Sequence, residues 1–326
     1  YYYFFHLKVF TIIHIKVYIS FIIMKKKNNL TVVIVTYLTD KKILLNCIQS
    51  IDRKIKIIIV ENSKNFRHKD YFLKKFSNVK VVCTGLNLGY GKGNNFGLNR
   101  VNTDYALILN PDIVCKADFS RKIVKLIKKN NKFSIIGCQY SNETAHLPAG
   151  FFDKKKHSTF QKKFFNNKRK QLIKVDWVTG CSMLINLKKY LNKDIFDKNY
   201  FLFFEEFDLC KSTNDRGGLV YSSSDLKVHH LGFKGSLGSN KAMKSDASKL
   251  RDWHWMWSYF YFYKKNHNYL YALIKISGKF FKSLLKTIFY TLLFDRPNRD
   301  KYLFRFLGML YSIVGSKSTY RGRRFY

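Results

Sequence analysis

A carboxylate stands at the end of a short apolar run. Leu107-Ile108-Leu109 leads into Asn110-Pro111-Asp112, and the proline ends the predicted strand so that Asp112 follows its tip. Ligands of open α/β sheets bind at the carboxyl ends of the strands. A carboxylate there suits a hard divalent cation, held by oxygen and shared with a substrate phosphate. Asn-Pro-Asp is also a common turn, so a purely structural turn is the alternative.

A second acidic group lies in an aromatic run. Glu205, Glu206 and Asp208 fall within Phe201–Cys210, in a chain with only 21 acidic residues. A carboxyl group in an apolar surrounding has a raised pKa, which suits a general base. The alternative is an exposed helix start where acidic residues favour the helix dipole.

Polar residues also follow the first two predicted strands. Thr36-Tyr37 ends one strand, and Glu61-Asn62 follows the next. An aromatic ring can stack on a nucleotide base, and a carboxylate can accept a hydrogen bond from a base N–H. A helix N-cap is the alternative for Glu61-Asn62. His229-His230 ends a later strand, where a histidine is either a second metal ligand or a structural residue.

The run from Asn87 to Gly97 is dense in glycine and asparagine and opens a helix directly after a strand. Glycines let the backbone approach a ligand closely, and a helix N-terminus offers N–H groups to phosphate. The dinucleotide pattern GxGxxG is absent, because Phe96 stands at the third glycine position counted from Gly91. The spacing of the phosphate loop GxxxxGK[ST] is absent as well. This argues against hydride transfer and kinase chemistry.

Strands and helices alternate from residue 31, and the strands are continuously apolar, as in a parallel sheet covered on both faces. Predicted strands are Thr31–Thr36, Ile55–Val60, Val79–Cys83, Tyr105–Leu109, Phe133–Gly137, Leu219–Tyr221 and Leu226–His230, with ordered structure at Trp177–Ile185. Predicted helices are Lys41–Ser50, Asp70–Phe76, Lys92–Val101 and Ala117–Lys129. The basic segment 151–174 is predicted to be a mobile loop. All strand tips should lie on one side of the sheet.

The two ends of the chain differ from this middle part. Residues 1–30 are expected to be a leader outside the functional unit, with Met24 as the natural start, because the chain opens on tyrosines and Met24 is followed by a lysine run and a strand. A membrane anchor is the alternative, although the apolar stretch before Met24 is shorter than the ~20 residues of a membrane span. Residues 31–244 are expected to form the catalytic domain. Residues 245–326 interleave aromatic and basic residues, which predicts two or three amphipathic helices resting on a surface.

Composition points to an anionic partner. The 326 residues carry a net charge of +39, so nucleic acid, an anionic membrane or a phosphorylated substrate could attract the chain. No pair of the six cysteines has metal-binding CxxC spacing, which favours reduced thiols in the cytoplasm.

The motifs occur in one order, and that order resembles the family 2 glycosyltransferases with the GT-A fold, in particular the rhamnosyltransferase-like branch of bacterial surface polysaccharide biosynthesis. The resemblance covers about residues 31–236. Its motifs are Thr36-Tyr37, Glu61-Asn62-Ser63, the run Asn87–Gly97, Asn110-Pro111-Asp112, Trp177–Cys181, Phe203–Leu209 and His230–Gly232.

The resemblance implies an α/β GT-A fold, a Rossmann-like mixed, mostly parallel sheet with helices on both faces, plus a C-terminal helical appendage. It implies Glu206 as catalytic base, with Glu205 and Asp208 as alternatives because the family usually has Glu-Asp where this chain has Glu205-Glu206. Asp112, with His230, would hold Mg²⁺ or Mn²⁺. The nucleotide-sugar would contact Thr36, Tyr37, Glu61, Asn62, Asn87, Gly89, Asn95, Asn110, Gly180 and Cys181.

The expected reaction is inverting, metal-dependent transfer of a sugar, such as the deoxyhexose rhamnose, from a nucleotide diphosphate-sugar to a saccharide or lipid-linked acceptor. The basic tail would then hold a cytoplasmic enzyme at the anionic inner face of the cell membrane. Three alternatives stay open: a nucleotidyltransferase of related fold, a basic nucleic-acid-binding protein, and a catalytically inactive homologue, which Glu206 leaves open. The first lacks a phosphate loop after Thr36, and the second lacks a recognised binding motif.

Overall fold

Four parallel strands form one half of the main sheet. The computed structural model describes residues 29–141, 148–166, 172–232 and 241–321, so residues 1–28 of the expected leader lie outside the described residues, whereas Leu30 already belongs to the first strand of the sheet. The strands lie in the order β3-β2-β1-β4. Thr36 pairs in register with Glu61, and Glu61 with Cys83, so these strands end at one edge. Their bounds are β1 Leu30–Thr36, β2 Lys56–Glu61, β3 Val79–Cys83 and β4 Tyr105–Leu109.

The other half of the sheet is mixed. β10 (Ser182–Asn186) lies antiparallel between β4 and β6 (Ile135–Tyr140). β11 (Val220–His230) runs parallel to β6 and antiparallel to β5 (Ile113–Cys115) and β8 (Leu172–Lys174). The two late strands expected from the sequence are one strand with an irregularity in its pairing. A separate pair is formed by β7 (Ala149–Gly150) and β9 (Trp177–Val178).

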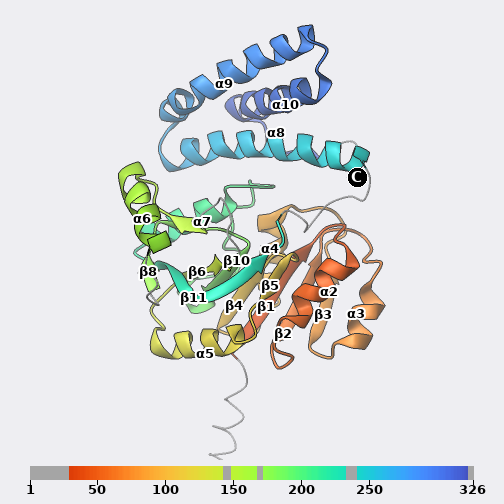
Figure 1. Ribbon diagram of the computed structural model, residues 1–326, viewed down its shortest axis with the longest axis vertical. Helices are drawn as coiled ribbons and strands as arrows, with labels where there is room; N and C mark the ends of the chain where they lie inside the picture. The colour runs from red at the N-terminus through yellow and green to blue at the C-terminus, as the bar shows by residue number, and fades with distance from the viewer. Residues whose placement is uncertain (1–28, 142–147, 167–171, 233–240, 322–326) are drawn as a thin grey trace, which may run out of the picture.

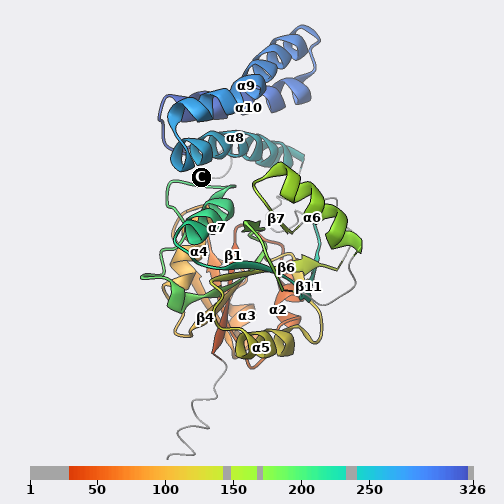
Figure 2. The same ribbon diagram turned by 90° about the vertical axis from the view of Figure 1, so that its left-hand side faces the viewer.

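Helices cover both faces of the sheet (Figures 1 and 2). Alternate residues of β1 point to opposite sides, with Val32 and Ile34 in one apolar core and Val33 in the other. The first core includes residues of α2 (Lys41–Gln49), α3 (Lys69–Lys75) and α5 (Phe119–Lys129). The second includes residues of α4 (Tyr90–Leu98), α6 (Lys154–Asn166), α7 (Glu205–Asp215) and the short helix η1 (Leu187–Lys189).

The prediction of a loop over 151–174 was wrong, because α6 occupies much of it. Asp153 caps the start of this helix: its side chain accepts a hydrogen bond from the backbone N–H of Lys156 at 2.8 Å. Phe160 is buried, and its ring meets that of Phe151 edge-on at 5.5 Å. One buried aromatic and a cap therefore fix a helix whose lysine-rich composition resembled that of a loop.

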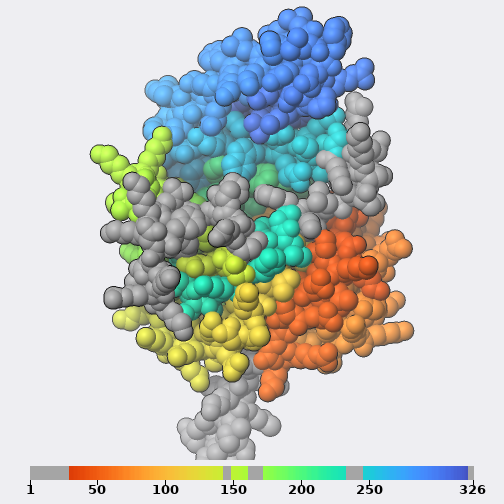
Figure 3. Space-filling view, in the orientation of Figure 1, coloured from red at the N-terminus to blue at the C-terminus, as the bar shows by residue number. Residues whose placement is uncertain are grey.

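Helices α8 (Lys241–Asn266), α9 (Tyr269–Leu292) and α10 (Arg296–Ile313) stack at one end of the molecule, over the sheet (Figures 1 and 3). They enclose a small apolar core of their own, which includes Phe260 and Met309. Within the described ranges, no helix combines the length and apolar character that crossing a membrane requires.

Candidate active site

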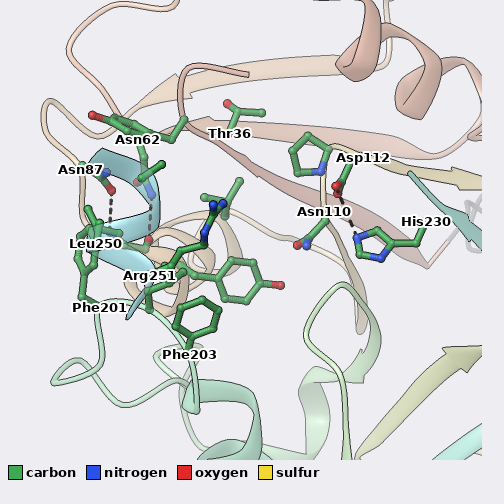
Figure 4. Close-up of a pocket in the computed structure, with 17 residues that line it drawn as sticks. Thr36, Asn62, Asn87, Asn110, Asp112, Phe201, Phe203, His230, Leu250 and Arg251 are labelled. Atoms are coloured by element: carbon green, nitrogen blue, oxygen red, sulfur yellow. Dashed lines mark hydrogen bonds and ion pairs between the residues drawn. The ribbon is translucent and has the colours of Figure 1, made fainter. Parts of the chain in front are cut away.

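A cavity of about 270 Å³ lies between the carboxyl edge of the sheet and α8. Eight of the residues predicted to bind the nucleotide-sugar or metal line it: Thr36, Tyr37, Asn62, Asn87, Gly89, Asn110, Asp112 and His230. Figure 4 labels six of them, Thr36, Asn62, Asn87, Asn110, Asp112 and His230, which converge from separate strands and loops. Side chains distant in sequence thus surround one space large enough for part of a nucleotide.

Asp112 and His230 meet at one side of this cavity (Figure 4). Nε2 of His230 lies 3.5 Å from Oδ2 of Asp112, and both side chains are largely shielded from solvent. Strand pairing fixes this approach, because His230 pairs with Ile113 and the N–H of Leu231 donates to the carbonyl of Asp112 at 3.0 Å. The ring of Tyr140 stacks on His230 with centroids 5.5 Å apart, which holds the imidazole in place.

The chemistry of this pair fits a divalent cation. A carboxylate oxygen and an imidazole nitrogen at this separation can share an ion such as Mn²⁺, while its other positions stay open to phosphate oxygens and water. No group of three or more ligating side chains occurs in the described part of the chain. An ion held by Asp112 and His230 would therefore depend on the substrate for its remaining ligands.

Glu61 is buried just behind the cavity wall. Its carboxylate accepts hydrogen bonds from the hydroxyls of Thr36 at 2.6 Å and Ser63 at 2.8 Å. Burial raises the pKa of Glu61, and these hydrogen bonds act in the opposite direction. Glu61 thus orients Thr36, which does line the cavity.

A hydrogen-bonded loop shapes the wall beside Tyr37. The side chain of Asn62 donates to the carbonyl of Gly89 at 2.8 Å, and the side chain of Asn87 accepts from the N–H of Gly89 at 3.0 Å. Burial raises the pKa of Tyr37, partly offset by a hydrogen bond with Asn87. Both asparagines therefore hold the start of α4 against the cavity.

Gly89 needs to be a glycine for two reasons. Its φ is +83°, and a Cβ at this position would lie 2.1 Å from the carbonyl oxygen of Phe201. That same carbonyl accepts from the N–H of Tyr90 at 2.9 Å. The glycine thus lets the start of α4 close against the segment that precedes α7.

Asn95 lies away from the cavity. Its side-chain amide donates to the carbonyl of Phe196 at 2.8 Å and accepts from the N–H of Phe196 at 3.0 Å. Because both ends of the amide are used by one backbone segment, Asn95 holds α4 to that segment, where we had expected it to follow the nucleotide.

The three acidic residues of α7 have different surroundings. Glu206 is half-buried beside Gly180, and burial raises its pKa to about 7. Glu205 is fully buried next to Gly91, and burial together with the charge of Glu206 raises its pKa well above the ordinary value. Asp208 receives hydrogen bonds from Lys265 at 2.6 Å and Asn266 at 3.1 Å, both on α8. Only Glu206 combines partial exposure with a pKa suited to proton transfer near neutrality.

The backbone before α7 is unusual. Phe203 and Phe204 both have positive φ, +69° and +68°, although neither is glycine. Consecutive residues in this region cost free energy and persist only where surrounding contacts impose them. Here the ring of Phe204 is packed against Trp255 and Phe262 of α8. The strained turn fixes the start of α7 and thereby the position of Glu206 in its first turn.

Cys181 connects the two ends of the site. Its carbonyl accepts from the N–H of Asn110 at 2.8 Å, and its thiol lies 3.0 Å from the hydroxyl of Tyr140. Burial is the main cause that raises its pKa to about 11, and the charges of Asp112 and Glu206 both add to it. The thiol therefore lies within the electrostatic reach of both carboxylates. Gly180 and Cys181 do not line the cavity, but the carbonyl of Gly180 accepts a hydrogen bond from the hydroxyl of Tyr90, which does.

One wall of the cavity was missed by the sequence analysis. Ala247, Leu250 and Arg251 of α8 line it, together with Phe201 and Phe203. The segment around Arg251 carries no recognisable motif, and we had expected this region to be an appendage outside the catalytic domain. Only the packing of α8 across the carboxyl edge reveals its contribution.

Comparisons with known proteins agree with this geometry. The chain matches the family described as "Glycosyl transferase family 2" over residues 31–195. Rhamnosyltransferase WbbL of Escherichia coli (strain K12) is 26% identical over 235 residues, which are 66% of this chain and 84% of that protein. The dTDP-rhamnosyl transferase RfbF of Shigella flexneri is 25% identical over 220 residues, 64% of this chain and 71% of that protein.

Among solved structures, a mannosyltransferase, PcManGT from Pyrobaculum calidifontis in complex with GDP-Man and Mn²⁺, has a TM-score of 0.51 and 10% identity, covering 87% of each chain. This likeness concerns the fold alone, and it confirms the expected GT-A-like architecture with a C-terminal helical region. The family match extends over more than half of the sequence and includes the edge that carries Thr36, Glu61 and Asp112. The chain therefore belongs to glycosyl transferase family 2 and is a glycosyltransferase.

Proposed function

We propose that this enzyme transfers a deoxyhexose such as rhamnose, with inversion and with the aid of a divalent cation, from a nucleotide diphosphate-sugar to a saccharide acceptor. The observation that carries the proposal is the cavity lined by Asp112, His230 and Tyr90, with Glu206 close to Gly180, the residue that contacts Tyr90. Rhamnose is proposed because two relatives are named for it. In the described part of the chain, no comparable site favours nucleotidyl transfer or nucleic-acid binding.

The donor would lie along the carboxyl edge. Tyr37 would stack on or beside the base, and Thr36, oriented by Glu61, would offer its hydroxyl to the base or ribose. Asp112 and His230 would hold Mg²⁺ or Mn²⁺ next to the diphosphate. When bound, the ion would neutralise negative charge on the leaving nucleotide.

Glu206 would act on the acceptor. Its carboxylate would take the proton of an acceptor hydroxyl, and that oxygen would form a bond to the anomeric carbon as the bond to the diphosphate breaks. Attack from the face opposite the leaving group inverts the configuration. Glu205 lies buried beside it, and burial together with the charge of Glu206 raises its pKa, which favours the protonated form.

We also propose that the acceptor is attached to lipid and that the enzyme works at the anionic inner face of the membrane. The support comes from α9, which carries four lysines and no acidic residue. Its buried residues lie on one side, while the opposite side is an exposed apolar stripe at helical spacing. We call this stripe the outer face of α9; it comprises Leu270, Ile274, Phe281, Leu285, Ile288 and Leu292.

The outer face of α9 fits a lipid surface better than water. Ile274, Leu285 and Leu292 are 68%, 65% and 72% exposed, and lysines 275, 279, 282 and 286 follow along the same helix. Apolar side chains can enter the boundary between headgroups and acyl chains while the lysines contact anionic headgroups.

The direct test is a screen of nucleotide diphosphate-sugars, dTDP-rhamnose included, with Mn²⁺, with Mg²⁺ and with EDTA. We expect release of one nucleoside diphosphate in the presence of metal and of a saccharide acceptor, and its loss with EDTA. The anomeric configuration of the product, read by NMR, tests inversion. Metal-independent turnover, or retention of configuration, would contradict the corresponding part of the proposal.

A further inference from the structure

Helix α8 places one arginine in the cavity. Figure 4 shows the side chain of Arg251 pointing from α8 into the space lined by Asn110 and Asp112. The other ionisable residues of the lining are Tyr37, Tyr90, Asp112 and His230. Arg251 is therefore the one permanently charged cation among the described residues that line this cavity.

The position of Arg251 is fixed by contacts that follow it along α8. Ser258 donates to the carbonyl of Leu202 at 2.9 Å, and the ring of His254 lies 4.6 Å from that of Phe201. Further along, Lys265 is 2.6 Å from both Asp197 and Asp208. These contacts join α8 to the segment that precedes and begins α7, so Arg251 and the cavity form parts of one packed unit.

The charge of Arg251 has no protein counter-ion in the described part of the chain. Neighbouring basic residues differ: Lys249 pairs with Asp300 at 2.8 Å, and Arg305 pairs with Asp252 at 2.7 Å. In a chain with 60 basic and 21 acidic residues, many exposed cations lack a partner. Arg251 stands apart because it is half-buried and directed into a ligand-sized cavity. A guanidinium in such a place favours a planar or tetrahedral oxyanion.

We propose that Arg251 binds the diphosphate of the donor, so that α8 is one wall of the nucleotide-sugar site. This inference rests on the proposed function and deepens it, because it names the part of the donor that the C-terminal region recognises. Asp112 and His230 would approach the diphosphate from the sheet edge, and Arg251 would approach from the helix that covers it. The guanidinium fork can donate to two phosphate oxygens at once, which an ammonium group cannot match.

The test separates phosphate recognition from base recognition. UDP, dTDP and GDP, each with Mn²⁺, and the matching nucleosides are titrated into the full chain and into the variants Arg251→Gln, Arg251→Lys and Lys249→Gln. The last variant removes the same charge from the same helix outside the cavity. Circular dichroism and the melting temperature check that each variant is folded.

We expect Arg251→Gln to raise the Kd for the preferred nucleoside diphosphate by about 10-fold to 100-fold, the loss that is typical when a hydrogen bond to a charged group is removed. Nucleoside binding should stay the same, Arg251→Lys should recover part of the loss, and Lys249→Gln should bind like the wild type. With the transfer assay, the KM for the donor should rise more than kcat falls.

Two results would overturn the inference alone. Either the Arg251→Gln variant binds the diphosphate as tightly as the wild type, or it loses nucleoside and diphosphate binding equally, which would indicate a role in the shape of the cavity. If the wild type binds no nucleoside diphosphate at all, the proposed function falls together with the inference.

Discussion

Replacing Glu206 by glutamine tests the proposed base while keeping the side-chain shape. The wild-type carboxyl is half-buried beside Gly180, and burial raises its pKa to about 7. A positioned base contributes about 10²-fold to 10⁴-fold to the rate. We therefore expect Glu206→Gln to lower kcat by that factor while the affinity for the donor nucleotide is unchanged, because Glu206 lies outside the donor cavity lining.

The pH dependence follows from the same pKa. Only the deprotonated carboxylate can take a proton, so kcat/KM of the wild type should rise about tenfold per pH unit below 7 and level off above about pH 8. The residual activity of Glu206→Gln should lack this rise. Turnover is measured by nucleoside diphosphate release between pH 5 and 9 with saturating metal.

The stability of the fold should fall over the same pH range in which the activity rises. The ordinary pKa of a glutamate is 4.5, and that of Glu206 in the folded chain is about 7. Between these values the folded state keeps a proton that the unfolded state has lost, so the free energy of unfolding falls as pH rises through this window, by at most about 3 kcal/mol. Glu206→Gln removes this loss. It should equal the wild type in stability below pH 4.5 and exceed it above pH 7, as measured by urea unfolding.

Glu205→Gln is the matched control. The pKa of Glu205 is raised well above the ordinary value by burial and by the charge of Glu206, and this fully buried side chain lies outside the cavity lining. We expect its glutamine variant to keep kcat within a few-fold of the wild type. Unimpaired turnover in Glu206→Gln, or a larger loss in Glu205→Gln, would refute the assignment of the base.

Three further predictions concern other parts of the molecule. Asp112→Asn should raise the concentration of Mn²⁺ needed for half-maximal activity by at least about tenfold, since it removes a charged ligand; an unchanged metal requirement would exclude Asp112 as a ligand. Gly85 and Gly89 both have positive φ, but only at Gly89 would an added Cβ meet the backbone oxygen of Phe201. In thermal unfolding, Gly85→Ala should therefore lower the stability by about 1–2 kcal/mol and Gly89→Ala by more; equal losses would count against the close approach to Phe201. Replacing Ile274, Leu285 and Leu292 of the outer face of α9 together by glutamine should reduce sedimentation with anionic phosphatidylserine vesicles while activity on a lipid-free acceptor persists; undiminished sedimentation would place membrane contact elsewhere.

The sequence by itself determined the parts that depend on local order along the chain. Continuous apolar strands predicted the parallel block, and the polar residues that follow them, such as Thr36 and Asp112, had to meet at one edge because parallel strands share a direction. The serial order of the motifs was sufficient to indicate the family. Helix α6 was missed because one buried aromatic residue decides it, and composition does not show burial.

The tertiary structure alone decided how the acidic residues of α7 differ and what the C-terminal helices do. Glu205, Glu206 and Asp208 are equivalent as a sequence cluster, and only their neighbours distinguish a buried acid, a half-exposed base and an ion pair with Lys265. Arg251 enters the cavity because α8 packs across the sheet edge, a contact between segments more than a hundred residues apart. Such contacts depend on shape complementarity between distant surfaces, which leaves no periodic or local pattern in the sequence.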